Sequence, residues 1–96
     1  MHAVVRTYSG QGAKELFELL EQRKADVERI IRSVSGLQSY SLIRTAEGGI
    51  SVTVCQNKSG TDESVRLAAE WVRENASELA TEAPDVSDGT VVLQLE

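Results

Sequence analysis

The sequence is poor in the residues that bind metals and carry redox chemistry. It has one cysteine, Cys55, and one histidine, His2, among 96 residues. A single cysteine excludes an internal disulfide, and this pair lacks the nitrogen and sulfur ligands that zinc and iron sites normally need. We therefore expect a protein without a metal or another cofactor.

Basic residues and long apolar runs are also scarce. Ten Lys and Arg stand against 15 Asp and Glu, a net charge of -5, so a nucleic-acid or membrane partner is not expected. No apolar run is long enough to span a bilayer, and the N-terminus shows no signal peptide, which predicts a cytoplasmic location. The length predicts one domain, 1–96, and so short a chain benefits from covering its surface with a second copy.

The glycines that are present include a Gly-x-Gly pair in YSGQGAKEL, between a strand-like and a helix-like stretch. A dinucleotide-binding loop has a third glycine three residues later. Here that place is Glu15, whose acidic side chain would lie near a pyrophosphate. Gly10 and Gly12 are therefore predicted to form a turn and not a phosphate site.

Hydrophobic periodicity predicts a strand over 2–8 and one helix from Ala13 to Val34, ended by Ser35-Gly36. The helix presents one apolar stripe. It consists of Leu16, Leu20, Val27, Ile30, Ile31 and Val34.

Two β-rich stretches, LQSYSLIRT and ISVTVCQ, flank a glycine-rich turn and predict a hairpin. With Glu47-Gly48 as its loop, Thr45 would pair with Ile50 and Tyr40 with Cys55.

The rest of the chain predicts a second helix and a last strand. The helix begins at Ser59-Gly60-Thr61-Asp62-Glu63 with a capping hydroxyl and follows a Val and Ala stripe. A loop around Pro84 precedes the last strand, TVVLQL. The order β-α-β-β-α-β predicts an α+β, ferredoxin-like fold: a four-stranded antiparallel sheet with two helices on one face and strands one and three at the centre.

In this order the chain resembles the antibiotic-biosynthesis-monooxygenase-like family of dimeric α/β-barrel proteins. The resemblance lies in VSGLQSYSLIR, GGISVTVCQN and SGTDESVRLAAEWVREN. It implies two sheets packed face to face in a homodimer. It also implies either cofactor-independent oxygenation of an aromatic molecule or haem degradation, and the histidine that haem-degrading members have on the second helix side has no counterpart here.

Four residues are candidates for binding a ligand: Tyr8, Arg23, Asn57 and Trp71. The resemblance suggests Asn57 and Trp71, as an asparagine near the end of strand three followed by a tryptophan. Trp71 lies about 120° from the centre of the helix stripe at about 100° per residue, which predicts a flanking position, either packing an edge or walling a pocket. Arg23 interrupts the first helix's stripe, either to lay its stem on apolar surface or to meet a ligand anion.

The polar residues of the strands are expected on the sheet face away from the helices. Arg6, Tyr8, Tyr40 and Arg44 would form a polar network inside a dimer there, or else receive an anionic ligand. The expected interface consists of Val4, Tyr8, Tyr40, Leu42, Thr53, Cys55 and Val92.

The sequence thus predicts a small dimeric protein that binds or oxygenates a small aromatic or apolar molecule. The alternative is a non-enzymatic dimeric structural or interaction module of the same fold. Neither the substrate nor a physiological partner follows from the residues.

Overall fold

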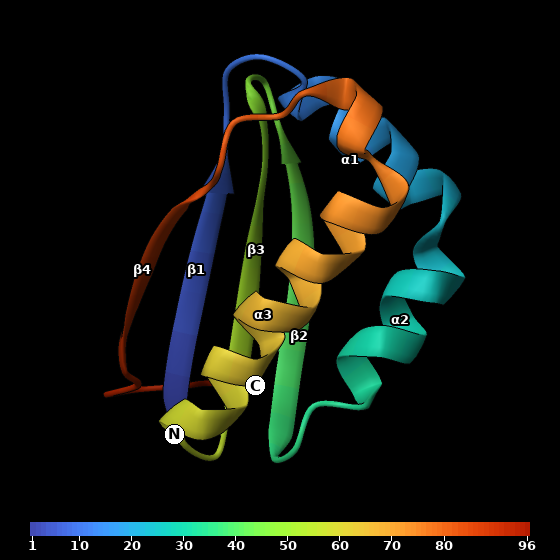
Figure 1. Ribbon diagram of the computed structural model, residues 1–96. Coiled ribbons are helices and arrows are strands. Elements are labelled where there is room, and N and C mark those ends of the chain that lie inside the picture. Colours follow the sequence, from blue (N-terminus) through green and yellow to red (C-terminus); the bar gives the residue numbers. More distant parts are fainter.

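The computed structural model describes residues 1–96 as one antiparallel sheet with helices on one of its faces (Figure 1). The sheet order is β2-β3-β1-β4, with β1 and β3 at the centre as predicted. The α+β, ferredoxin-like fold is therefore confirmed. The elements are β1 (His2–Tyr8), α1 (Ala13–Gln22), α2 (Lys24–Arg32), β2 (Leu37–Thr45), β3 (Gly48–Cys55), α3 (Lys58–Asn75), the short 3-10 helix η1 (Ser77–Leu79) and β4 (Asp85–Thr90).

The turn between β1 and α1 has the glycine conformation predicted for it. Gly10 and Gly12 have φ angles of 83° and 79°, a left-handed region that glycine adopts without steric cost. Gly12 is the N-cap of α1, so this Gly-x-Gly pair is a turn.

The first helical segment is two helices, so the prediction of one helix over 13–34 is wrong. The break lies at Arg23, whose φ of -112° and ψ of 32° leave the helical region. Its amide donates to both Leu19 and Leu20 carbonyls, which ends α1 with a tightened turn. The predicted apolar stripe nevertheless points to the sheet on both sides of the break, because the bend occurs between Leu20 and Val27.

The hairpin has a different register from the predicted one. Thr45 pairs with Gly48 and Tyr40 with Thr53, so the loop is Ala46-Glu47. The error is two residues, and it arises because both glycines belong to β3 and not to the turn. At Gly49 a side chain would collide with the Phe17 ring, so β3 needs a glycine where α1 crosses it.

The two faces of the sheet are the reverse of the prediction. Arg6, Tyr8 and Tyr40 lie under the helices, and Arg44 pairs with Glu21 of α1. The expected dimer face is therefore wrong, since Val4, Thr53 and Cys55 are fully buried on the helix side. The prediction placed the more aliphatic face of the sheet, with Ile43, Ile50 and Val52, against the helices. In the structure the helices cover the opposite face, which carries Arg6, Tyr8 and Tyr40.

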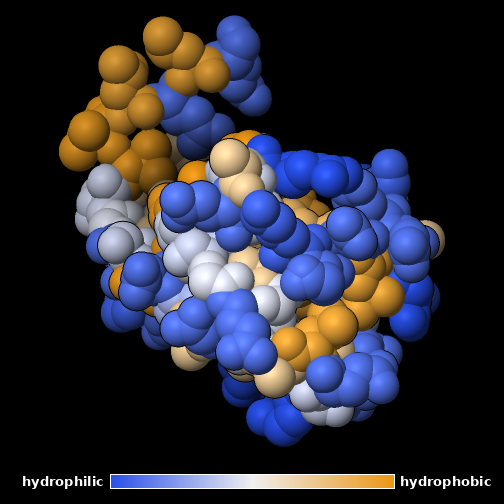
Figure 2. All heavy atoms as spheres, turned by 90° about the horizontal axis from the view of Figure 1, so that it is seen from above, coloured by the Kyte–Doolittle hydropathy of each residue, from blue (hydrophilic) through white to orange (hydrophobic).

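The last strand begins earlier than predicted. β4 is the polar stretch Asp85–Thr90, paired only with β1, and an edge strand with both faces exposed needs no apolar residues. The predicted strand TVVLQL instead leaves the sheet at Val91. Its side chains are the most exposed apolar ones in the chain: Val92 95%, Leu93 74% and Leu95 83%. They form the apolar arm that stands away from the body in Figure 2.

Candidate ligand-binding site

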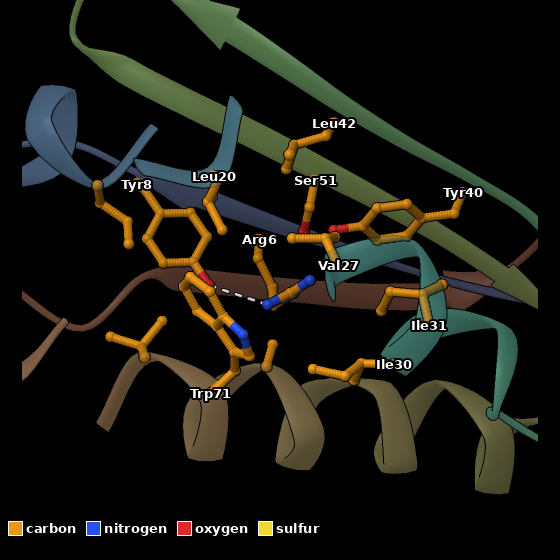
Figure 3. Close-up of a pocket in the computed structure, with 13 residues that line it drawn as sticks. Arg6, Tyr8, Leu20, Val27, Ile30, Ile31, Tyr40, Leu42, Ser51 and Trp71 are labelled. Carbon is orange, nitrogen blue, oxygen red and sulfur yellow. Dashed lines mark hydrogen bonds between the residues drawn. The ribbon is translucent and has the colours of Figure 1, made fainter. Parts of the chain in front are cut away.

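A cavity lies between the sheet and all three helices (Figure 3). β1 and β3 form its floor, β2 one wall, and α1, α2 and α3 the roof. Its free volume is about 40 Å³, enough for a few water molecules and too little for a ring. The lining residues are Arg6, Tyr8, Leu16, Leu20, Val27, Ile30, Ile31, Tyr40, Leu42, Ser51, Ala68, Trp71 and Val72.

Trp71 is in the core, so its predicted flanking position is wrong. It is 8% exposed. The buried side of α3 carries Gly60, Thr61 and Ser64 in addition to Trp71, together with Ala68 and Val72 of the predicted Val and Ala stripe, which line the cavity. Small residues let the first half of α3 lie close to the sheet, and Trp71 fills the wider space beneath the second half.

Arg6 is the unusual residue of the cavity. Its side chain is 3% exposed, and Nη1 donates a hydrogen bond to Tyr8 Oη at 2.9 Å. Its Nε has no partner, and none of the ion pairs of the chain involves it. A guanidinium keeps its charge in proteins, and a buried charge is costly unless it is paired. The cavity therefore holds a positive charge without a counter-ion.

Further polar groups gather around this charge. The register places Ser51 directly opposite Arg6 and Thr53 opposite both Val4 and Tyr40. The hydroxyls of Ser51 and Thr53 are buried without a hydrogen-bond partner. Burial raises the pKa of Tyr40, which keeps its phenol protonated, although the Arg6 charge acts in the opposite direction. Figure 3 shows the Tyr40 hydroxyl directed toward Arg6 and Ser51.

The cavity adjoins a wider groove between β2 and the α1–α2 pair. The groove has a volume of about 760 Å³, within the range of small-molecule sites. Val27, Ile31, Tyr40 and Leu42 line both spaces and so form the partition between them. Movement of these side chains would join the cavity and the groove into one site large enough for an aromatic ligand.

The structure brings together three of the four predicted site residues. Tyr8 and Trp71 line the cavity. Arg23 lies outside it, with its guanidinium 5.7 Å from the Trp71 ring centroid and paired with Asp26. This cation–π contact links the helix break to a residue of the cavity wall.

Asn57 does not belong to this site. It is the exposed N-cap residue of α3, and its Oδ1 accepts a hydrogen bond from Ser59 Oγ at 2.5 Å. At 1.5 Å per residue it is about 20 Å along α3 from Trp71. The helix start predicted at Ser59 is correspondingly one residue late, and no side chain caps it.

Arg6, Tyr40 and Ser51 line the cavity but were not among the four candidates, because they, like Tyr8, were expected on the face away from the helices. The sequence contained a signal for Arg6. This residue stands between Val5 and Thr7 in a strand that the topology places at the centre of the sheet. A charged residue in a central strand is expected to be functional or paired.

No group of three or more His, Cys, Asp and Glu residues is arranged to hold a metal ion. The single histidine is the first residue of the central strand β1, outside the cavity lining, with Nε2 2.7 Å from Asp88 Oδ2 of β4. The cavity lining contains neither histidine nor cysteine, so it does not fit haem held by either ligand. No helix is long and apolar enough to cross a membrane.

No sequence-family profile and no curated protein matches the chain. Solved structures do match, over 99% of this chain. A protein of unknown function from Nitrosomonas europaea has 14% identity, a TM-score of 0.68 and 91% of its own chain covered. A Streptomyces coelicolor monooxygenase, solved with nanaomycin D, has 20% identity, a TM-score of 0.64 and 89% of its own chain covered. The haem degrader MhuD of Mycobacterium tuberculosis, solved with two haems, has 16% identity, a TM-score of 0.64 and 98% of its own chain covered.

The chain has the fold of the antibiotic-biosynthesis-monooxygenase-like proteins. The resemblance identified from the sequence is confirmed at this level, and identities this low establish the fold alone.

Proposed function

We propose that the protein binds a small aromatic molecule in the cavity and the adjoining groove. The observation that carries this proposal is the arrangement of the site. An apolar cavity lined by Tyr8, Tyr40 and Trp71 is divided from a groove of about 760 Å³ only by side chains. Apolar and aromatic walls with a few convergent polar groups are typical of small-molecule sites.

The similar structures support this function. Two of the proteins that share the fold were solved with nanaomycin D or haem bound. Small organic ligands are thus compatible with the fold. The polar inner end in this chain orients a ligand, because Arg6 and Ser51 offer donors on one side only.

If the site is catalytic, the reaction we propose is cofactor-independent oxygenation of an easily ionised aromatic substrate. The substrate itself would then supply the electrons that reduce O₂. Tyr8 and Trp71 would hold the ring, and the Arg6 charge would favour an anionic form of the substrate. Oxygen uptake with a bound phenol, measured with an oxygen electrode, is the test of this step.

Binding itself is tested through the fluorescence of Trp71, the single tryptophan. Phenols and aromatic acids should quench it saturably. Ala68→Leu fills the cavity that Ala68 lines, so we expect affinity to fall about tenfold, equivalent to about 1.4 kcal/mol. Ala69→Leu places the same side chain on the exposed side of α3 and should leave affinity unchanged. Equal affinities of the two variants would exclude the cavity as the site.

We also propose that the protein is a homodimer that packs through the uncovered face of the sheet. That face, the open face, carries the apolar side chains that alternate with the cavity residues. They are Ala3, Val5, Ile50 and Val52, which are half-buried, Ile43, which is exposed, and Val54, which is buried. Aliphatic surface of this kind usually marks an interface, and two sheets packed face to face would bury it.

The apolar arm supports the same assembly. In residues 91–96 the side chains of Val92, Leu93 and Leu95 are mostly exposed to solvent. A second copy of the chain, packed on the open face, would cover both that face and the arm. If the dimer forms but no aromatic ligand binds, the alternative of a non-enzymatic dimeric module is favoured instead.

A further inference from the structure

We propose that the ligand of this site is an anion whose carboxylate pairs with the buried guanidinium of Arg6. The inference rests on the proposed function, and it adds the charge of the ligand and its orientation. A carboxylate matches the planar donor fork of an arginine and can accept two parallel hydrogen bonds from it.

The first argument is the missing counter-ion. Arg6 uses one of its donors on Tyr8, and its Nε remains unpaired. The cavity lining contains no acidic residue, and the two that line the adjoining groove pair elsewhere: Glu21 with Arg44 and Glu28 with Arg32. Nothing within the chain neutralises the charge.

The second argument is that dimerisation does not supply the counter-ion. Arg6 projects from β1 toward the helices, on the opposite side of the sheet from Val5 and Val52. A partner packed on the open face is separated from the guanidinium by the sheet itself. The charge must therefore be met from the cavity.

The third argument is the clustering of the unsatisfied atoms. The buried side-chain atoms without partners are Arg6 Nε, Ser51 Oγ and Thr53 Oγ1, and they lie on adjacent central strands. Water can satisfy hydroxyls, but it leaves the positive charge of Arg6 uncompensated. A carboxylate serves both, since it accepts from the guanidinium and from Ser51.

The ligand would lie with its carboxylate at the sheet and its apolar part toward the groove. Tyr8 and Trp71 bound the inner end, and Val27 and Leu42 form the partition that the apolar part displaces. This orientation requires the anionic group to enter first, which the basic inner end of a net acidic protein favours.

The test compares 2-naphthoate with its neutral counterpart 2-naphthamide by isothermal titration calorimetry. For the unaltered protein we expect naphthoate to bind at least about tenfold more tightly. In Arg6→Met the two should bind within about twofold of each other, because an apolar side chain of similar length replaces the guanidinium. Arg66→Met makes the same change in net charge on exposed α3, away from the site, and should keep the preference.

The outcomes separate the two proposals. Equal binding of naphthoate and naphthamide to the unaltered protein would overturn the carboxylate inference and leave aromatic binding intact. Absence of binding by both would overturn the proposed function and this inference with it. Arg6→Met should also melt at the same or a higher temperature than the unaltered protein, since it removes an unpaired charge. A clear fall in melting temperature would mean that Arg6 serves the fold and would count against the inference.

Discussion

At the scale of single residues, steric fit and polar mismatch occur side by side on the helix face of the sheet. Gly49 provides the space into which Phe17 packs, and Phe17 meets the Tyr8 ring edge-on at 5.7 Å. Two residues before Tyr8 in β1, Arg6 faces Ser51, and both have unpaired polar atoms. The tight packing at Gly49 fixes the position of α1, whereas the polar mismatch marks the place for a ligand.

The packing at Gly49 gives a prediction for stability. Gly49→Ala should destabilise the protein by about 1–3 kcal/mol, as overpacking in a core does, because the added methyl collides with the Phe17 ring. Gly89→Ala is the matched control, since nothing lies within 4 Å of the added methyl there, and it should stay within about 0.5 kcal/mol. Urea denaturation followed by circular dichroism measures both. Similar midpoints for the two variants would contradict the packing of α1 on β3.

At the scale of elements, the break between α1 and α2 is the feature that shapes the site. Arg23 stands at the break, contacts the Trp71 ring and pairs with Asp26 in the first turn of α2. Arg29 also reaches Asp26, at 3.3 Å. The carboxylate of Asp26 therefore ties the start of α2 to the end of α1.

This tie predicts a pH dependence. The hydrogen bond from Arg23 holds the pKa of Asp26 below its usual value, with the charges of Arg23 and Arg29 acting in the same direction. Because the folded-state pKa is the lower one, the contribution to stability is present above about pH 4, the unfolded-state value. It is lost as the pH falls through the folded-state pKa.

Asp26→Asn should therefore melt at a lower temperature than the unaltered protein at pH 6, and the difference should shrink toward pH 3. Glu74→Gln removes a carboxylate that makes no ion pair and should show no such pH-dependent difference. Thermal melts followed by circular dichroism across this range measure the effect. A difference that stays constant with pH would show that the Asp26 charge does not tie the helices together.

The elements also show what the sequence reveals and what it hides. The β1 strand, the helix stripe and the strand order are predictable because alternation and the 3.6-residue period are local signals. The direction each strand face points is not local. β1 has Val5 on one face and Val4 on the other, so its pattern fits either orientation of the strand. If the space under the helices is assumed to be apolar, Arg6 favours placing its own face away from the helices, which is the wrong orientation. Trp71 was misplaced for a different reason: the centre of the α3 stripe was taken from Val and Ala residues, whereas Gly60, Thr61 and Ser64 are also buried and shift that centre toward Trp71.

At the scale of the whole molecule, both faces of the sheet are specialised. The helix face holds the aromatic and charged residues of the site, and the open face holds aliphatic residues around Val5 and Val52. A monomer would leave the open face and the apolar arm in water. The dimer we propose turns the sheet into a central layer, with helices and ligand sites on the outside.

Val52→Glu at the centre of the open face should split this dimer, because a buried unpaired carboxylate is costly. Multi-angle light scattering should then give a mass of 10.5 kDa in place of twice that mass. Val86→Glu makes the same substitution at the edge strand β4, where the side chain is 48% exposed, and should leave the dimer intact. An unaltered protein that is monomeric at micromolar concentration would contradict the assembly.

The small free volume of the cavity has a consequence for how tightly any ligand is held. Only Ile31 of α2 is fully buried, so this helix is weakly anchored and is the natural part to move outward. The binding-competent form is then a minor population, and the measured affinity is the intrinsic affinity reduced by that fraction. The protein thus has two separable controls on recognition, the chemistry around Arg6 and the ease with which α2 opens. A relative with the same cavity residues and a looser α2 would bind the same ligand more tightly.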